Sequence, residues 1–305
     1  MEIARKINHF VVLIFLAVVL SACTPSGQQT TQTHMSGTEG ITLSFVGNSP
    51  PPIIYVDDRG DDRVSIDIEA RNRGTSPSNV EVFFSGFDER IVDVQSISGF
   101  DFSSEVDYRT RFNPVGGYRE VSTTLNVRDL GTSSAYEFPL RVIYCYDYET
   151  VAAVQLCVDP NPHRRNTADA CTPSSVNTNG QGAPVGISSV EQESMPGRVR
   201  LKINVQHYGQ GQVLTQNAEC RGIPARSEED YIAFSPPTLG GIPGDCPTQN
   251  PVKLQNGRAN IICNFDLPDA DAPSYMTLLE MRLEDYKIKD SIQRNIRIIN
   301  ERTRR

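Results

Sequence analysis

The sequence predicts an all-β protein made of two tandem antiparallel β-sandwich domains. Apolar and polar residues alternate over many short segments, for example 64–70 and 199–205, and a period of two is typical of strands with one buried face. The second half of the chain repeats the first. Long stretches with apolar residues at helical spacing are absent from the sequence, and 20 Pro and 22 Gly supply turns between short strands.

The first 22 residues are typical of a secretory signal. Arg5 and Lys6 precede an apolar stretch at 10–20, which is too short to cross about 30 Å of hydrocarbon. The sequence Leu-Ser-Ala-Cys then ends at Cys23. This ending resembles the lipobox of prokaryotic lipoproteins, in which the Cys is lipidated and becomes the mature N-terminus. The resemblance implies a protein held by a lipid at the outer face of the cytoplasmic membrane, at the cell surface.

The remaining chain divides by composition. Residues 23–40 are polar apart from Met35, so we expect a disordered tether. One β-sandwich domain is expected over 41–158 and a second over 185–300, each folding alone. The segment between them, 159–184, is polar and rich in Pro, Gly and Asn, and we expect it to form a linker.

Alternation places several strands in each domain. In the first domain the expected strands are 64–70, 79–84, 90–94, 120–127, 138–146 and 151–158. In the second they are 199–205, 231–234, 259–265, 277–286 and 292–298.

The two domains look like copies of one unit. RVSIDIEARNRG at 63–74 matches RVRLKINVQHYG at 198–209, an offset of 135. Asn-Pro-Val at 113–115 matches the same tripeptide at 250–252, and Tyr146 matches Tyr286. The offset grows along the chain from 135 to 137 to 140, as small loop insertions would produce.

These repeats resemble a known class of domain. A strand ending in Asn72-Arg73-Gly74, a late Tyr-rich strand and tandem copies resemble Ig-like domains of the cell-adhesion-related type, which occur in prokaryotic surface proteins. The run YCYDYETVAAVQLCVDPNP, with GQGAPV downstream, is similar to a group of uncharacterised archaeal surface lipoproteins. The resemblance covers most of 41–299 and implies fold, not chemistry. The second copy departs from the motif, with His-Tyr-Gly at 207–209.

Six cysteines follow Cys23, and an even number in an exported chain indicates disulfides. Cys145 and Cys157 lie symmetrically about Val151, so a hairpin centred there would place them opposite each other and within bonding distance. Their counterparts at offset 140, Asp285 and Arg297, would then form a facing pair of opposite charge.

Strand polarity suggests the remaining two bonds. If successive strands of the second domain alternate in direction, Cys220 and Cys263 lie at one end, and Cys171 and Cys246 lie at the other. An additional strand within 221–237 would overturn this assignment.

Two acidic clusters are candidates for an ion. The first comprises Asp57, Asp58, Asp61 and Asp62, and the second comprises Asp266, Asp269 and Asp271. Ca²⁺ takes several oxygens from loops of this kind. Arg59 and Arg63 neutralise part of the first cluster, and its spacing fits no EF-hand, so a solvated turn is the favoured interpretation. We expect no metal and no cofactor.

The sequence indicates a binding or structural role rather than catalysis. It contains no Gly-x-Ser-x-Gly, His-Glu-x-x-His or phosphate-loop motif, and its four His are scattered. A net charge of −8 opposes nucleic-acid binding. We expect a non-enzymatic surface lipoprotein with a structural, adhesive or assembly role, whose partners are the membrane and other surface proteins or glycans. The alternatives are a solute-binding lipoprotein, which normally needs a larger α/β fold, and an extracellular hydrolase with an unrecognised site within 208–250.

Overall fold

The computed structural model describes residues 36–56, 62–128, 130–164 and 169–301. Over these residues the protein is all-β, with several antiparallel sheets and no α-helix, which confirms the predicted class. All of the described residues belong to one compact unit.

The first half of this unit contributes eight strands to the described part of the chain. They are β1 (Ile41–Phe45), β2 (Ile53–Val56), β3 (Asp62–Asn72), β4 (Ser78–Ser85), β5 (Val92–Val94), β6 (Phe100–Phe102), β7 (Gly117–Val127) and β8 (Ala135–Val158).

The second half has two long strands at its start, several short ones and a very long last strand. They are β9 (Val176–Asn177), β10 (Val185–Met195), β11 (Arg198–His207), β12 (Gln212–Thr215), β13 (Tyr231–Phe234), β14 (Thr238–Leu239), β15 (Ile242–Pro243), β16 (Val252–Lys253), β17 (Arg258–Asp266) and β18 (Tyr275–Asn300).

Three main sheets form from these strands. One four-stranded sheet has the order β1-β3-β7-β5, and another has the order β17-β11-β10-β9. The largest sheet has the path β15-β14-β18-β8-β4-β6, with β2, β12 and β13 also paired to β18. Alternate residues of each sheet are buried, and the buried side chains join in one hydrophobic cluster.

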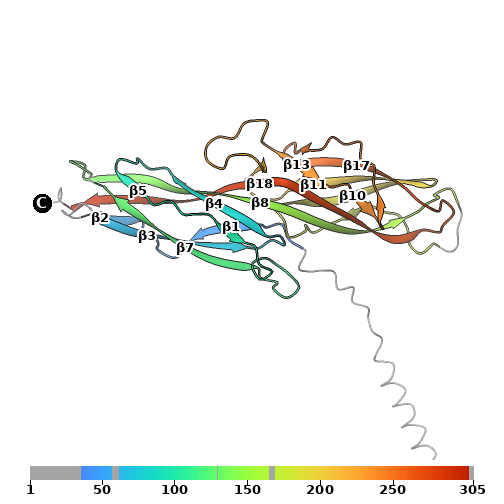
Figure 1. Cartoon of the computed structure of the whole chain (residues 1–305), viewed down its shortest axis with the longest axis horizontal. Helices are drawn as coiled ribbons and strands as arrows, with labels where there is room; N and C mark the ends of the chain where they lie inside the picture. The colour runs from blue at the N-terminus through green and yellow to red at the C-terminus, as the bar shows by residue number, and fades with distance from the viewer. Residues whose placement is uncertain (1–35, 57–61, 129, 165–168, 302–305) are drawn as a thin grey trace, which may run out of the picture. The chain divides into compact units, whose positions relative to one another are not determined.

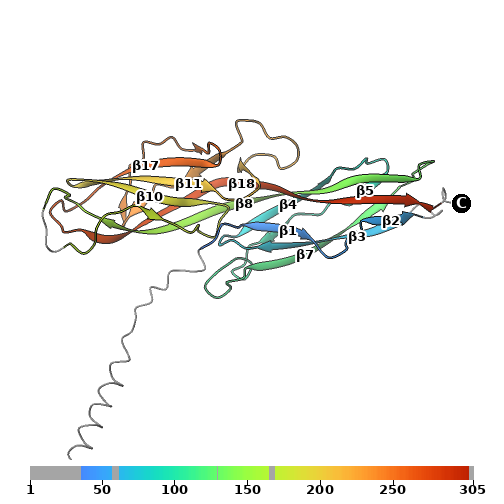
Figure 2. The same ribbon diagram turned by 180° about the vertical axis from the view of Figure 1, so that it is seen from behind.

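Strands β8 and β18 are continuous and run side by side through both halves. They pair antiparallel from Tyr275↔Val158 to Ile299↔Ala135, and both views show them together along the middle of the unit (Figure 1 and Figure 2). One end of the pair lies with β2 and β4, and the other with β13 and β14. Each half of the unit therefore contains a segment of the other half's last strand.

The sequence prediction of a break in each of these strands is wrong. The expected strands 138–146 and 151–158 are parts of β8, and 277–286 and 292–298 are parts of β18. Even-numbered residues of β8 are buried without interruption from Phe138 to Val158. In β18 a bulge between Leu283 and Tyr286 moves the buried side from odd to even positions, and Asp285 has φ 56° there.

The sequence repeat reappears in the strand pairing. β3 pairs with β1 and β7, and β11 pairs with β10 and β17. Val80 of β4 lies opposite Tyr146 of β8, and 135 positions later Thr215 of β12 lies opposite Tyr286 of β18. The two tyrosines are themselves 140 positions apart, which is the offset found in the sequence.

Parts of the expected tether and linker are bonded to the sheets. Arg109 Nη1 donates to the Ser36 carbonyl oxygen at 2.8 Å. The Gly37 N–H donates to the Asn179 carbonyl oxygen, and the Gly37 carbonyl oxygen accepts from the Gly182 N–H. Within the expected linker, Ala183 is fully buried. The ordered body therefore begins before Ile41 and includes the end of 159–184.

Candidate functional site

Three of the four residues in the first acidic cluster lie outside the described residues. This holds for Asp57, Asp58 and Asp61, and also for the proposed lipidation residue Cys23. Asp62 is described and opens β3, opposite Val127. Among the described residues, no cluster of three His, Cys, Asp or Glu side chains could hold a metal ion.

The second acidic cluster is matched by arginines. Arg198 Nε donates to Asp266 Oδ1 at 2.6 Å, and Arg164 Nη1 lies 3.7 Å from Asp271 Oδ1. Asp269 Oδ1 accepts from the backbone N–H of Asp271, as in a turn. Asp269 therefore stabilises a turn, while Asp266 and Asp271 are paired with arginines.

The six later cysteines all form disulfides, but not in the expected pairs. Cys145 bonds Cys220, Cys157 bonds Cys171, and Cys246 bonds Cys263. The expected bond between Cys145 and Cys157 is wrong because both lie on β8. Twelve residues of one strand separate them by roughly 40 Å.

The supporting charge argument fails for the same reason. Asp285 and Arg297 both lie on β18, and Arg297 Nε instead contacts Glu137 Oε1 at 3.2 Å across the pair with β8. The expected bonds Cys220–Cys263 and Cys171–Cys246 are also wrong, because Asp245 bridges Asn264 on β17 and thereby places Cys246 beside Cys263. The strand in 221–237 is β13, which is the expected strand 231–234 and not an additional one.

Two of the disulfides cover the outer face of β8. Odd-numbered residues of this strand face away from the core, yet Cys145 and Cys157 are both buried. Cys220, in the loop after β12, covers Cys145, and Cys171, in the segment before β9, covers Cys157. Two segments of the second half are thereby fixed onto the last strand of the first half.

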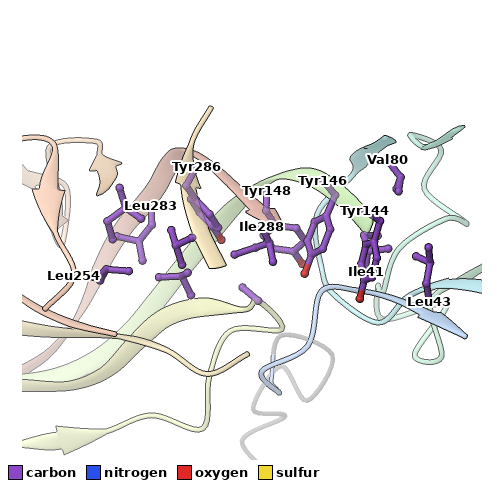
Figure 3. Packing of buried hydrophobic residues seen from close by; sticks show 14 of the residues in the cluster. Ile41, Leu43, Val80, Tyr144, Tyr146, Tyr148, Leu254, Leu283, Tyr286 and Ile288 are labelled. Carbon is purple, nitrogen blue, oxygen red and sulfur yellow. The ribbon is translucent and has the colours of Figure 1, made fainter. Parts of the chain in front are cut away.

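Where β8 passes from one half to the other, four tyrosines fill the core. We call this group the tyrosine junction; it comprises Tyr144, Tyr146, Tyr148 and Tyr286, each less than 5% exposed. Successive rings lie 6.2, 6.0 and 6.2 Å apart between centroids. Figure 3 shows them in a row between Leu283 on one side and Ile41 on the other.

Hydroxyl groups of the junction tie segments from both halves together. Tyr148 Oη accepts from the Thr75 backbone N–H at 2.9 Å and donates to the Gly182 carbonyl oxygen at 2.7 Å. Thr150 Oγ1 lies 2.7 Å from Tyr286 Oη and donates to the Val185 carbonyl oxygen at 2.6 Å. Buried hydroxyls are thus satisfied by backbone groups from 74–76 and 181–185.

Burial makes these phenols hard to ionise. Loss of solvation raises the pKa of Tyr148 to about 12, opposed by its hydrogen bonds with Thr75 and Ser76. Burial also raises the pKa values of Tyr146 and Tyr286 well above the usual 10. The junction therefore stays neutral over the physiological range and serves as packing rather than as a base.

A buried lysine lies on the opposite face of the same pair of strands. Lys287 is 7% exposed, and its Nζ lies 3.6 Å from Glu81 Oε1 and 3.9 Å from Asp147 Oδ1. It also donates to the Ala218 carbonyl oxygen at 3.2 Å. Burial raises the pKa of Asp147, and Lys287 opposes that rise. The lysine holds the loop after β12 onto the strands of the first half.

Glycine is required beside the junction. A Cβ added at Gly74 would lie 1.8 Å from Tyr148 Oη and 2.9 Å from the Gly182 carbonyl oxygen. The expected Asn-x-Gly motif at 72–74 thus has a packing role, and Asn72 Oδ1 accepts from the Gly74 N–H at 3.0 Å. The sequence also held the signal for the junction, because tyrosines at 144, 146 and 148 share one face of a strand.

No protein-family model matches this chain, and no curated protein matches its sequence. The structure contains no helix long and apolar enough to cross a bilayer within its described residues.

Proposed function

We propose that this protein is a lipid-anchored surface protein with a structural, adhesive or assembly role and no catalytic activity. Cys23 carries the lipid, and the strands from β1 onward form the extracytoplasmic body. Its partners are other surface proteins or glycans.

The proposal includes two Ig-like domains. The sheet order β1-β3-β7-β5 corresponds to strands A, B, E and D of an Ig-like sandwich, and β4 followed by β8 corresponds to C and F. The C-terminal part of β18 then takes the place of strand G in the first domain, with β2 parallel to it. By the same reasoning the C-terminal part of β8 is strand G of the second domain, so the two domains exchange their last strands.

The observation that carries the proposed location is the set of three disulfides. Disulfides persist in oxidising compartments and are rare in reducing ones. They agree with export directed by the basic and apolar leader before Cys23.

The shared strands support a structural or adhesive role. In a chain of independent domains, a linker sets the geometry between neighbours. Here two strands of 24 and 26 residues pass through both halves, and the Cys145–Cys220 bond crosses between them. The arrangement favours a body that keeps its binding surfaces at fixed separation.

Fractionation of the native cell tests the anchor. The unmodified chain should pellet with membranes and enter a detergent phase, and Cys23→Ser should move it to the soluble fraction. A Cys23→Ser variant that stays in the washed membrane pellet would overturn the anchoring proposal. Crosslinking of intact cells followed by capture of the protein then identifies its partners.

A further inference from the structure

The loop between β6 and β7 presents a group of apolar side chains to solvent. Val106, Phe112 and Val115 are 69%, 81% and 71% exposed. Single exposed apolar residues are ordinary on protein surfaces, but three large ones on a loop of about a dozen residues mark an interaction surface. We call residues 103–116 the apolar loop.

Hydrogen bonds within the apolar loop hold these side chains outward. The Thr110 N–H donates to the Asn113 carbonyl oxygen at 3.0 Å, and Thr110 Oγ1 accepts from the N–H groups of Phe112 and Asn113. Asn113 Nδ2 donates to the Val106 carbonyl oxygen at 2.7 Å, which joins the two tips of the loop. These hydrogen bonds fix the backbone of the loop in a conformation that leaves the three apolar side chains exposed.

The chain enters the body directly beside this loop. Arg109 Nη1 donates to the Ser36 carbonyl oxygen, and Arg109 Nε donates to the Pro114 carbonyl oxygen at 3.2 Å. In Figure 1 and Figure 2 the loop before β7 lies next to the start of the described chain. Ser36 is thirteen residues after Cys23, a span of at most about 47 Å when fully extended.

The loop carries one exposed carboxylate, Glu105, while its other charged groups suit a lipid interface. Asp107 is buried, and its Oδ2 accepts from Arg119 Nη2 at 2.9 Å, so this carboxylate is paired. At the tip the Arg111 guanidinium lies 4.4 Å from the centroid of the Phe112 ring. An aromatic ring with a neighbouring arginine can enter the acyl boundary while the guanidinium stays among headgroups.

We propose that the apolar loop docks onto the outer leaflet of the membrane that holds the lipid of Cys23. This inference rests on the proposed lipid anchor, which brings Ser36 and the loop near the bilayer. The loop supplies a second, apolar contact, so that the body is held to the bilayer at two points and takes one orientation.

The chain contains no Trp, so one substitution provides a site-specific probe. The chain from Cys23 onward would carry Phe112→Trp and be coupled through Cys23 to a maleimide lipid in phosphatidylcholine vesicles. The six other cysteines are paired with one another, which leaves Cys23 for coupling. The matched control is Ile223→Trp, at a position 97% exposed in the loop between β12 and β13.

Docking is expected to shift the tryptophan emission of the Phe112→Trp variant to the blue and to let brominated acyl chains quench it, with neither effect in Ile223→Trp. Uncoupled protein should bind vesicles weakly, and Phe112→Ser with Val115→Ser should lower that binding about tenfold, or about 1.4 kcal/mol. Ile223→Ser should leave it unchanged. Equal, water-like emission from both tryptophan-bearing variants would overturn the inference, as would a blue shift that appears only when envelope proteins are added.

Chemical coupling separates this test from the proposed anchor. If Cys23→Ser stays membrane-bound in cells, the anchor proposal fails whatever the vesicle spectra show. If the anchor is confirmed and the vesicle-coupled Phe112→Trp variant remains solvent-exposed, the docking inference alone fails.

Discussion

The Cys145–Cys220 disulfide should contribute more to stability than either of the other two. It joins β8 to the loop after β12, with a sequence separation of 75 residues. The Cys157–Cys171 and Cys246–Cys263 bonds close segments of 14 and 17 residues. The perturbation is the replacement of each pair by two alanines.

The magnitude follows from the entropy of closing a loop in the unfolded chain. That cost grows with the logarithm of loop length, so the longest loop gives about 4.5 kcal/mol and each short loop gives about 3 kcal/mol. Cys145 and Cys220 are both buried, whereas Cys171 and Cys246 are only partly buried, so the loss of buried sulfur acts in the same direction as the loop length. We expect the Cys145→Ala, Cys220→Ala variant to be less stable than the other two by about 1.5 kcal/mol.

Urea unfolding followed by circular dichroism measures the difference. The midpoint should fall furthest for the Cys145–Cys220 replacement, with the slope little changed among the three variants. Peptide mapping without reduction checks the pairing first. The reasoning is refuted if the long-loop variant is the most stable of the three, or if mapping recovers a peptide joining Cys145 to Cys157.

Three further outcomes follow from the junction and the strands around it. Gly74→Ala should destabilise by about 1–3 kcal/mol in a thermal melt, because its Cβ would overlap Tyr148 Oη; an unchanged melt would contradict the packing. Burial raises the pKa of Tyr148 to about 12, so the neutral phenol's contribution to the stability of the folded state is complete below about pH 10 and falls above it, by up to about 1.4 kcal/mol per pH unit. Tyrosinate absorbance should appear together with unfolding, and stability should fall less steeply with pH in Tyr148→Phe. Burial raises the pKa of Asp147, and Lys287 opposes this rise. Removing the lysine should raise that pKa further, which destabilises the folded state at any pH where the unfolded chain carries an ionised carboxylate. Lys287→Met should therefore cost more stability at pH 7 than at pH 4, and an equal loss would exclude the pairing.

The sequence was sufficient for the strands that have one wet face. At β3 and β11, apolar residues alternate with charged ones, and the period of two is unambiguous. The repeat offset was also visible, since it reflects the same pairing in both halves.

The long strands were misread because a repeat does not reveal which copy a segment pairs with. The expected turn near Val151 lies in Asp147-Tyr148-Glu149-Thr150, a stretch without Gly, Pro or Asn. Absence of turn residues there indicated a continuous strand. Whether that strand returns on its own sheet or extends into the next is decided by tertiary contacts, such as those between Tyr286 and Thr150.

For the site residues as well, the sequence indicated which kinds of residue matter but not which distant segments they contact. Cysteine number indicated disulfides, but pairing depends on which distant loops cover β8, as Cys220 and Cys171 do. The apolar loop carried no periodic signal, because its exposure follows from local hydrogen bonds such as that of Asn113. Lys287 is polar in sequence and buried only because the Ala218 loop closes over it.

The central structural claim is that β8 and β18 bind both halves into a single folding unit. The sequence alone suggested that each half folds by itself, whereas each now lacks a partner strand when separated. Fragments 36–164 and 169–301 would be expressed apart and examined by circular dichroism and thermal melting, alone and in equimolar mixture. We expect no cooperative melt from either fragment alone and a cooperative β-sheet melt from the mixture. Cooperative melting of each isolated fragment, unchanged on mixing, would contradict the claim.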